Sequence, residues 1–133
     1  MNHRRLFLGL VLSAAGALLL SNVRIADAKG GGTVSLITLN PVAGATGKGK
    51  AKYKVNGSER ELQIEAELGR SRRGISVQFL VNSTVIATLT TNGLGKAEYN
   101  ANTELGASVP NVSPGTVVQV KRTGGAVILQ GTF

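Results

Sequence analysis

The chain has 133 residues, no cysteine, one histidine and a formal net charge of +8 at neutral pH. A chain without cysteine forms no disulfide, so its fold must depend on packing and backbone hydrogen bonds. After residue 28 the sequence contains no His, Cys, Asp, Trp or Met. These are the residue types that most nucleophilic, redox and transition-metal sites require, so the composition argues against an enzyme and against a bound metal or cofactor.

The first 28 residues have the pattern of a secretory signal peptide. A basic opening precedes an apolar run at residues 6–20, and Ala26-Asp27-Ala28 is a small-x-small cleavage pattern. The run is shorter than the roughly 20 apolar residues of a membrane-spanning helix. We predict a helical signal peptide over residues 1–28 that is cleaved on export, leaving a secreted or periplasmic protein with no membrane span. The segment Arg4-Arg5-Leu6-Phe7-Leu8 resembles a twin-arginine motif, so both the Sec and the twin-arginine routes stay open.

The rest of the chain has the size of one domain. We expect residues 29–32, Lys-Gly-Gly-Gly, to form a flexible leader and residues 33–133 to form a single folded unit. Three basic residues and one acidic residue belong to the predicted signal peptide, so the mature domain carries a net charge of +6. The mature domain is therefore moderately basic.

Every periodic segment of the mature domain has a period of two, which predicts β-strands. The alternation is clearest at residues 48–55, where lysines alternate with small and apolar residues, and at residues 62–68. We predict eight strands, at residues 33–39, 48–55, 62–68, 75–82, 85–91, 96–101, 116–122 and 126–133. Seven to eight short strands with frequent turns indicate an all-β fold, an antiparallel β-sandwich (Ig-like or similar) or a small barrel.

Hairpin turns predict how neighbouring strands pair. Asn56-Gly57 read as a two-residue loop aligns three lysines with glutamates: Lys54 with Glu59, Lys52 with Glu61 and Lys48 with Glu65. We therefore interpret the lysine stripe at residues 48–54 as a solvated charge ladder rather than as a ligand-binding comb. The next hairpin leaves two registers open. A two-residue loop at Asn82-Ser83 places Phe79 beside Ile86, and a three-residue loop places it beside Ala87.

The best candidate for a binding site is a cluster of arginines. Arg70, Arg72 and Arg73 follow the predicted strand at residues 62–68 and have no acidic neighbour in the sequence. Two interpretations stay open, contact with an anion and solvated loop charge that aids solubility, and Lys121 and Arg122 extend the patch only if the fold brings them near. Nucleic acid is a poor fit, because the mature domain has four aromatic residues and no interleaving of basic with aromatic positions.

Two catalytic patterns fail on their details. Residues 44–51 nearly match the phosphate-binding pattern G-x-x-x-x-G-K-[ST], but Ala51 replaces the hydroxyl that holds Mg²⁺, and the segment leads into a strand. Glu65 and Glu67 lie on one strand face about 6.6 Å apart, a spacing that approaches that of an inverting glycosidase pair. Such a pair needs a sheltered carboxyl of raised pKa, and an exposed strand face does not supply one. We expect no catalytic residue.

The second half of the mature chain resembles a known group of proteins. It contains the segment Val85-Ile86-Ala87-Thr88-Leu89-Thr90-Thr91-Asn92, then Gly95-Lys96-Ala97, Pro114-Gly115-Thr116-Val117-Val118-Gln119-Val120 and a final Gly131-Thr132-Phe133. These motifs resemble small exported bacterial β-sandwich domains of unknown function. The resemblance implies the fold and carries no catalytic residue.

The sequence thus predicts an exported, non-catalytic module with a structural or binding role in the cell envelope or extracellular space. Its partner would be an envelope protein. One alternative is binding of an acidic polysaccharide through Arg70, Arg72 and Arg73. A second alternative is a hydrolase that uses Glu with Ser or Lys.

Overall fold

The computed structural model describes residues 23–26 and 32–133. The predicted helical signal peptide and flexible leader therefore lie largely outside the described residues. Two parts of them are described: residues 23–26 form a strand, and Gly32 is buried.

The described chain contains nine strands and two single-turn 3₁₀ helices. In chain order they are β1 (Val23–Ala26), β2 (Thr33–Pro41), β3 (Lys48–Asn56), β4 (Glu59–Glu67), η2 (Arg70–Arg72), β5 (Ser76–Val81), β6 (Thr84–Thr90), β7 (Lys96–Asn102), η3 (Thr103–Leu105), β8 (Val117–Arg122) and β9 (Val127–Thr132). The eight predicted strands correspond to β2 through β9, and every strand pair is antiparallel. The all-β, antiparallel prediction is confirmed.

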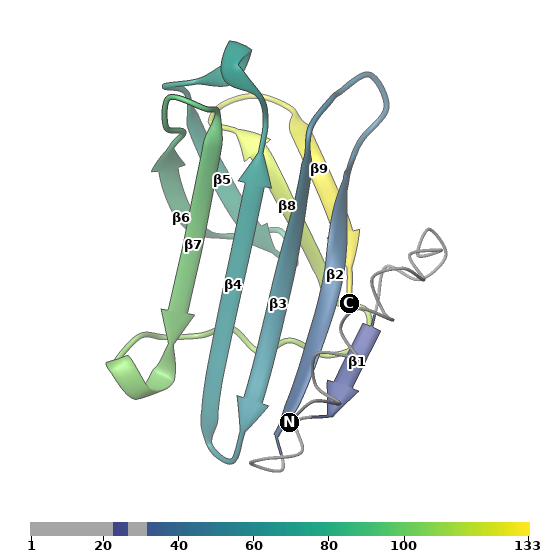
Figure 1. Cartoon of the computed structure of the whole chain (residues 1–133), viewed down its shortest axis with the longest axis vertical. Helices are drawn as coiled ribbons and strands as arrows, with labels where there is room; N and C mark the ends of the chain where they lie inside the picture. Colours follow the sequence, from purple (N-terminus) through teal and green to yellow (C-terminus); the bar gives the residue numbers. More distant parts are fainter. Residues whose placement is uncertain (1–22, 27–31) are drawn as a thin grey trace, which may run out of the picture.

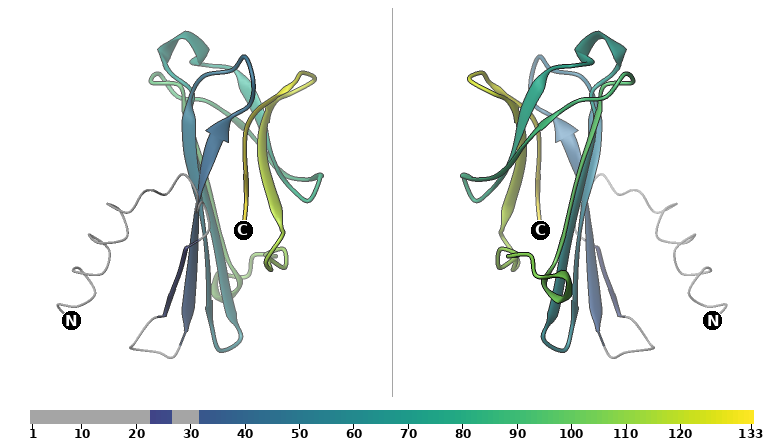
Figure 2. Two further views of the ribbon diagram at one scale, coloured as in Figure 1. Left: turned by 90° about the vertical axis from the view of Figure 1, so that its right-hand side faces the viewer. Right: turned by 90° about the vertical axis from the view of Figure 1, so that its left-hand side faces the viewer.

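The strands form one nearly closed sheet (Figure 1). Their order is β6-β5-β8-β9-β2-β3-β4-β7, with β1 beside β2 off this path. The long strand β2 joins the two halves of the sheet, because its residues 33–39 pair with β3 and its last two residues pair with β9. The halves face each other across the interior (Figure 2). The end strands β6 and β7 are not paired with each other, so the sheet stays open along that seam.

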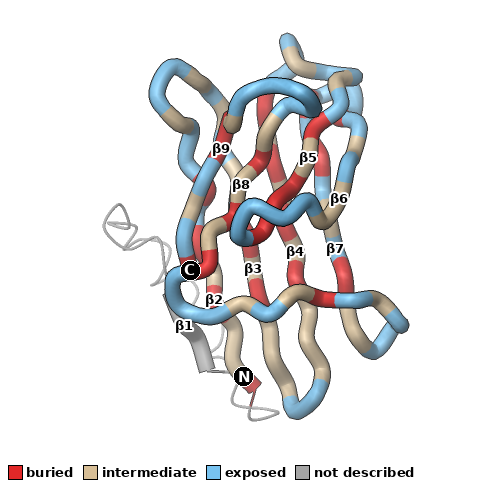
Figure 3. The backbone as a smooth tube through the Cα atoms, turned by 180° about the vertical axis from the view of Figure 1, so that it is seen from behind, coloured by how far each residue is buried: buried red, intermediate tan, exposed pale blue. Residues whose placement is uncertain are grey.

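Buried residues alternate with more exposed ones along the strands (Figure 3), and most of the buried ones are apolar. The largest fully buried side chains are Phe79, Leu39, Leu62, Ile64, Leu129, Val77, Val118 and Val120. Each contributes about 1.5–3 kcal/mol through burial. Phe133 is 5% exposed and packs edge-on against Tyr53, with ring centroids 6.4 Å apart, so the C-terminal aromatic residue belongs to the core.

One row across the sheet is built from small residues. Gly49 pairs with Ala66, and Ala66 pairs with Ala97. A Cβ atom on Gly49 would lie 3.1 Å from the Leu129 side chain of the opposite half. The small row therefore lets the two halves approach closely where β9 crosses over β3 and β4.

The predicted register of the first hairpin was wrong by two residues. The loop is Gly57-Ser58 rather than Asn56-Gly57, so Asn56 pairs with Glu59, and Lys54 pairs with Glu61. Gly57 has a φ of 65° and Ser58 is not among the residues with positive φ. This is the pattern of a type II′ turn, which places Gly first, whereas the prediction assumed two left-handed residues. A shift of two residues keeps each side chain on its face, so the lysines remain outside.

The second hairpin combines features of both predicted registers. Its loop has two residues, Asn82 and Ser83, with φ angles of 48° and 70°. Nevertheless Phe79 pairs with Ala87, because the register shifts between Phe79 and Leu80 and leaves Ile86 as an extra residue. The bulge shifts the pairing of β6 with β5 by one residue, and the length of the loop alone does not predict this shift.

The segment Asn92-Gly93-Leu94-Gly95 joins β6 and β7, which do not pair with each other, so it is not a hairpin turn. It carries the chain from β6 in one half of the sheet to β7 in the other. The Asn92 side-chain oxygen accepts hydrogen bonds from the amides of Leu94 and Lys96, at 2.9 and 3.0 Å. Gly95 then lies directly against the backbone of Gly69 in the loop after β4. Two connections between the halves are thus packed together at one end of the molecule.

Candidate functional site

The three predicted arginines lie at the end of the molecule where β4 finishes. Buried Leu68 anchors the chain after β4, and Gly69, with a φ of 92°, turns it into η2. Arg70 and Arg73 are exposed and Arg72 is half-buried. The short helical turn thus presents two guanidinium groups to solvent and directs the third against the protein.

Arg72 has a structural role in this loop. Its Nη1 donates a 2.8 Å hydrogen bond to the carbonyl oxygen of Thr46, in the loop between β2 and β3. The same atom lies 3.5 Å from the carbonyl oxygen of Leu68. The charge of Arg72 is therefore fixed between two loops, while Arg73 makes only a local contact with the Arg70 carbonyl oxygen, at 3.4 Å.

The fold brings four further cations to the same end. Lys48 begins β3 and Lys96 begins β7, and their amines lie 3.8 Å from the two carboxylate oxygens of Glu67. Lys121 and Arg122 arrive at the end of β8, where they pair with Gln78 and Val77 of β5. The sequence left their placement open. We call these seven residues the basic end: Arg70, Arg72, Arg73, Lys48, Lys96, Lys121 and Arg122.

One acidic residue, Glu67, partly neutralises the basic end. In the part of the chain that the structure describes, the ion pairs involve Lys48, Lys50 and Lys96, and none of the arginines takes part in one. These pairs are exposed, so each contributes at most about 1 kcal/mol to stability and is weakened by salt. Arg70, Arg73 and Arg122 are thus exposed cations that take part in no ion pair among the described residues.

The opposite end of the sheet carries charges of both signs. Glu59 and Glu61 lie at the start of β4, and Glu104 lies in η3 nearby. Arg60 lies between the two glutamates on β4, and Lys54 of β3 pairs with Glu61. The Glu59 carboxylate accepts a 2.9 Å hydrogen bond from the Asn102 side chain. The cations at this end are therefore balanced by glutamates, in contrast to those of the arginine loop.

The lysine stripe forms the predicted charge ladder with different partners. Lys54 lies opposite Glu61, Lys50 opposite Glu65 and Lys48 opposite Glu67 on the outer face. The amine of Lys50 is 3.7 Å from the Glu65 carboxylate. The stripe is therefore largely neutralised, in contrast to the arginines.

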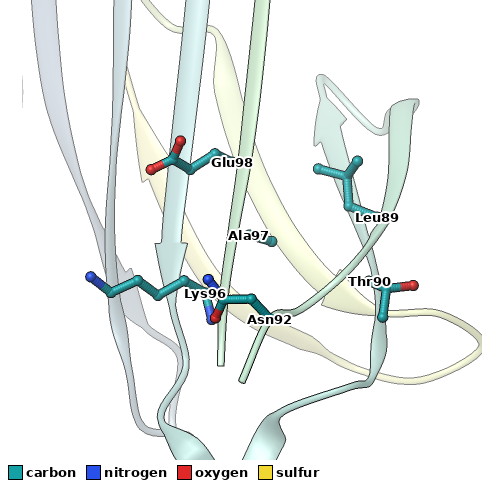
Figure 4. A pocket seen from close by; sticks show the side chains of 6 residues that line it. All are labelled: Leu89, Thr90, Asn92, Lys96, Ala97 and Glu98. Carbon is teal, nitrogen blue, oxygen red and sulfur yellow. The ribbon is translucent and has the colours of Figure 1, made fainter. Parts of the chain in front are cut away.

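A shallow depression of about 300 Å³ lies beside the open seam between β6 and β7 (Figure 4). Its lining residues are Leu89, Thr90, Asn92, Lys96, Ala97 and Glu98. Lys96 and Glu98 extend away from Leu89 and Thr90, so the charged and apolar groups do not converge on one point. The depression lacks the arrangement of a nucleophile and a base.

The carboxyl groups do not form a sheltered acid–base pair in the described ranges. Each glutamate of residues 32–133 is at least partly exposed, and Glu65 and Glu67 both lie near lysines. The described residues also contain no cluster of three or more His, Cys, Asp or Glu side chains that would hold a metal ion. Among them, no helix has the length and hydrophobicity that a bilayer crossing requires.

Comparison with known proteins gives no relative for this chain: no family model, curated protein or solved structure matches it. The functional argument therefore depends on the chemistry of its own surface. The feature of that surface with the most distinct chemistry is the basic end.

Proposed function

We propose that this protein is an exported, non-catalytic binding module whose basic end contacts an acidic polymer, such as an anionic glycan of the cell envelope. The observation that supports the proposal most is the gathering of seven cations at one end of the sheet, of which Lys48 and Lys96 alone form ion pairs among the described residues. Four separate segments of the chain contribute them. Neutralising these charges with a polyanion would release bound counterions, which favours binding at low salt.

The arrangement suits a polymer better than a small anion. The cations are spread over loops and strand ends, and the exposed arginines Arg70, Arg73 and Arg122 do not line the depression described above. A small anion is bound tightly when several donors surround it in a desolvated pocket. A chain of repeated negative charges can instead contact dispersed cations one after another.

We propose for the fold the finer description of an Ig-like β-sandwich, with β2 shared between its two sheets. The facing halves support this description, and so does the resemblance of the second half of the chain to small exported bacterial sandwich domains. The proposed route to the envelope is cleavage of a signal peptide after Ala28, following either the Sec or the twin-arginine pathway.

A protein partner in the envelope is the second candidate. The observation that favours it is the open seam, because β6 and β7 each have one edge that pairs with no other described strand. Val85 on β6 is 45% exposed, so this edge also presents apolar surface. A strand from a partner could add to either edge.

Binding to glycans of defined charge tests the first proposal. The protein is titrated with an anionic polysaccharide and with a neutral one of similar length, at low and at physiological salt. Two variants remove equal charge: Arg70→Ala/Arg73→Ala at the basic end and Lys52→Ala/Lys54→Ala toward the opposite end of β3. We expect salt-dependent binding to the anionic polymer alone, weakened roughly fivefold by the first variant and little by the second. Salt-independent binding, or equal losses in both variants, would contradict the proposal.

A further inference from the structure

The strand β1 covers an edge of β2 that no other strand of the described residues reaches. β1 pairs with β2 over four residues, with Val23 opposite Leu36, Arg24 opposite Ser35 and Ile25 opposite Val34. On its other side β2 pairs with β3 over residues 33–39. β9 lies on the same side as β1 but pairs only with Asn40 and Pro41 (Figure 1). Residues 33–36 of β2 therefore have one partner on this edge, and it is β1.

The covering strand lies inside the predicted signal peptide. Residues 23–26 precede the proposed cleavage site after Ala28, whereas all the described core residues belong to residues 32–133. Cleavage would remove β1 and leave the rest of the sheet in place. The mature protein would then have an edge of unpaired backbone groups on β2, flanked by the half-buried side chains of Val34 and Leu36.

We propose that the β2 edge uncovered by cleavage pairs with the same edge of a second copy, forming an antiparallel dimer with Ser35 on its two-fold axis. The inference rests on the export step of the proposed function and is independent of glycan binding. In this register Val34 lies opposite the partner subunit's Leu36, and Thr33 lies opposite the partner subunit's Ile37. The two half-sheets containing β2, β3, β4 and β7 would form one continuous sheet across the axis.

The sequence of β2 itself supports a second copy as the occupant. The segment that covers the edge reads Val23-Arg24-Ile25, and β2 presents Val34-Ser35-Leu36 in the same alternation of apolar, polar and apolar residues. An antiparallel copy places these residues where β1 lay, with the partner subunit's Ser35 in the position of Arg24. Because Ser35 keeps the same orientation toward the edge, the hydrogen-bond pattern of the β1–β2 ladder is preserved.

The charges near the edge also permit the dimer. The nearest lysines on the outer face, Lys52 and Lys54, belong to β3, one strand away from the edge. Across the dimer axis the β3 strands of the two copies would be about 14 Å apart. This exceeds the Debye length of about 8 Å at physiological ionic strength. The lysines also face Gln63 and Glu61 on β4, so repulsion between the copies is small.

Cysteine cross-linking tests the proposed axis directly, because the native chain contains no cysteine. Ser35→Cys would place two thiols at directly paired positions, whose Cα separation of about 4.5–5.5 Å suits a disulfide. Ser58→Cys, in the exposed β3–β4 turn, is the matched control. Under mild oxidation we expect Ser35→Cys to form a covalent dimer at least tenfold faster than Ser58→Cys. Equal rates would overturn the proposal.

The role of β1 is tested with two chains that differ only at the N-terminus, residues 29–133 and residues 23–133. Both retain the whole described core. Light scattering coupled to size exclusion should show a dimer for the shorter chain and a monomer for the longer one, and Leu36→Lys should make the shorter chain monomeric while circular dichroism confirms its fold. A monomeric shorter chain, or dimers of both chains, would overturn the proposal. The intact mass of the exported protein tests cleavage after Ala28 separately, so failure of export and failure of dimerisation are distinguishable.

Discussion

The hydroxyl group of Thr91 donates a 2.6 Å hydrogen bond to the carbonyl oxygen of Arg72. The same hydroxyl accepts a 3.0 Å hydrogen bond from the amide of Ile75, and Thr91 is only 3% exposed. One buried side chain thus holds the segment after η2 against the connection between β6 and β7. The position of the arginines depends on this contact.

Replacing this hydroxyl with a methyl group should destabilise the fold. Thr91→Val has nearly the same shape but removes both hydrogen bonds, leaving the amide of half-buried Ile75 and the carbonyl oxygen of half-buried Arg72 without this partner. We expect the free energy of unfolding to fall by about 1–3 kcal/mol, as measured by chemical denaturation. Thr90→Val, at an exposed neighbouring position, is the control. Equal effects of the two substitutions would show that the Thr91 hydroxyl has no special role.

Gly95 should not tolerate a side chain. A Cβ atom there would lie 1.8 Å from the carbonyl oxygen of Gly69, and the residue has a φ of 78°. Gly95→Ala must therefore separate two packed loops and strain the backbone, at a cost of at least about 3 kcal/mol. This loss of stability is measured from the fall in the thermal unfolding midpoint. Gly93→Ala lies in the same loop with nothing within 4 Å, so a comparable loss there would refute the argument.

Stability should decline at alkaline pH through Tyr99. Burial raises the pKa of its phenol above the ordinary value of 10.0. The unfolded chain therefore loses this proton first, so the contribution of Tyr99 is intact below pH 10 and is lost as pH rises through the folded-state pKa. Absorbance titration of Tyr53→Phe isolates Tyr99, because the chain has two tyrosines. A midpoint at or below about 10 would contradict this prediction.

Neutralising Glu67 should strengthen anion binding with little effect on stability. Glu67 lies between Lys48 and Lys96, but its side chain is 40% exposed. We expect Glu67→Gln to change the free energy of unfolding by less than about 1 kcal/mol. Its affinity for an anionic glycan should rise at low salt and converge with that of the unchanged protein at high salt. Glu61→Gln, toward the opposite end of β4, should not produce this increase, and an equal increase in both variants would rule out a local effect.

The strands and their inward faces could be predicted from the sequence because both follow from a period of two. The hairpin at Gly57 shows why an incorrect turn assignment did not change which side chains were predicted to face inward. Moving the loop by one residue shifted the register by two, and Lys50 rather than Lys52 faces a glutamate, yet every lysine stayed on the outer face. Side-chain direction survives an even shift, whereas individual ion pairs do not.

The bulge and the basic end depend on contacts that alternation does not encode. The extra residue Ile86 in β6 leaves no local signal, because both registers place apolar residues near Phe79. Lys121 and Arg122 reach the arginine loop only because β8 pairs with β5, about 40 residues earlier in the chain. Such pairing is decided by how the whole sheet closes. The arginine cluster could therefore be identified as a candidate site from the sequence. The placement of the other four cations of the basic end beside it could not be predicted.

The last strand of the chain occupies the middle of the sheet. β9 lies between β8 and β2, and its residue Gln130 pairs with Asn40 of β2. The two halves of the sheet thus cannot be joined until β9 has been synthesised, and loss of β9 would split the sheet at its centre rather than trim an edge. Contacts so distant in sequence also make folding slow. The sheet would therefore remain open during synthesis and close only when β9 pairs with β2.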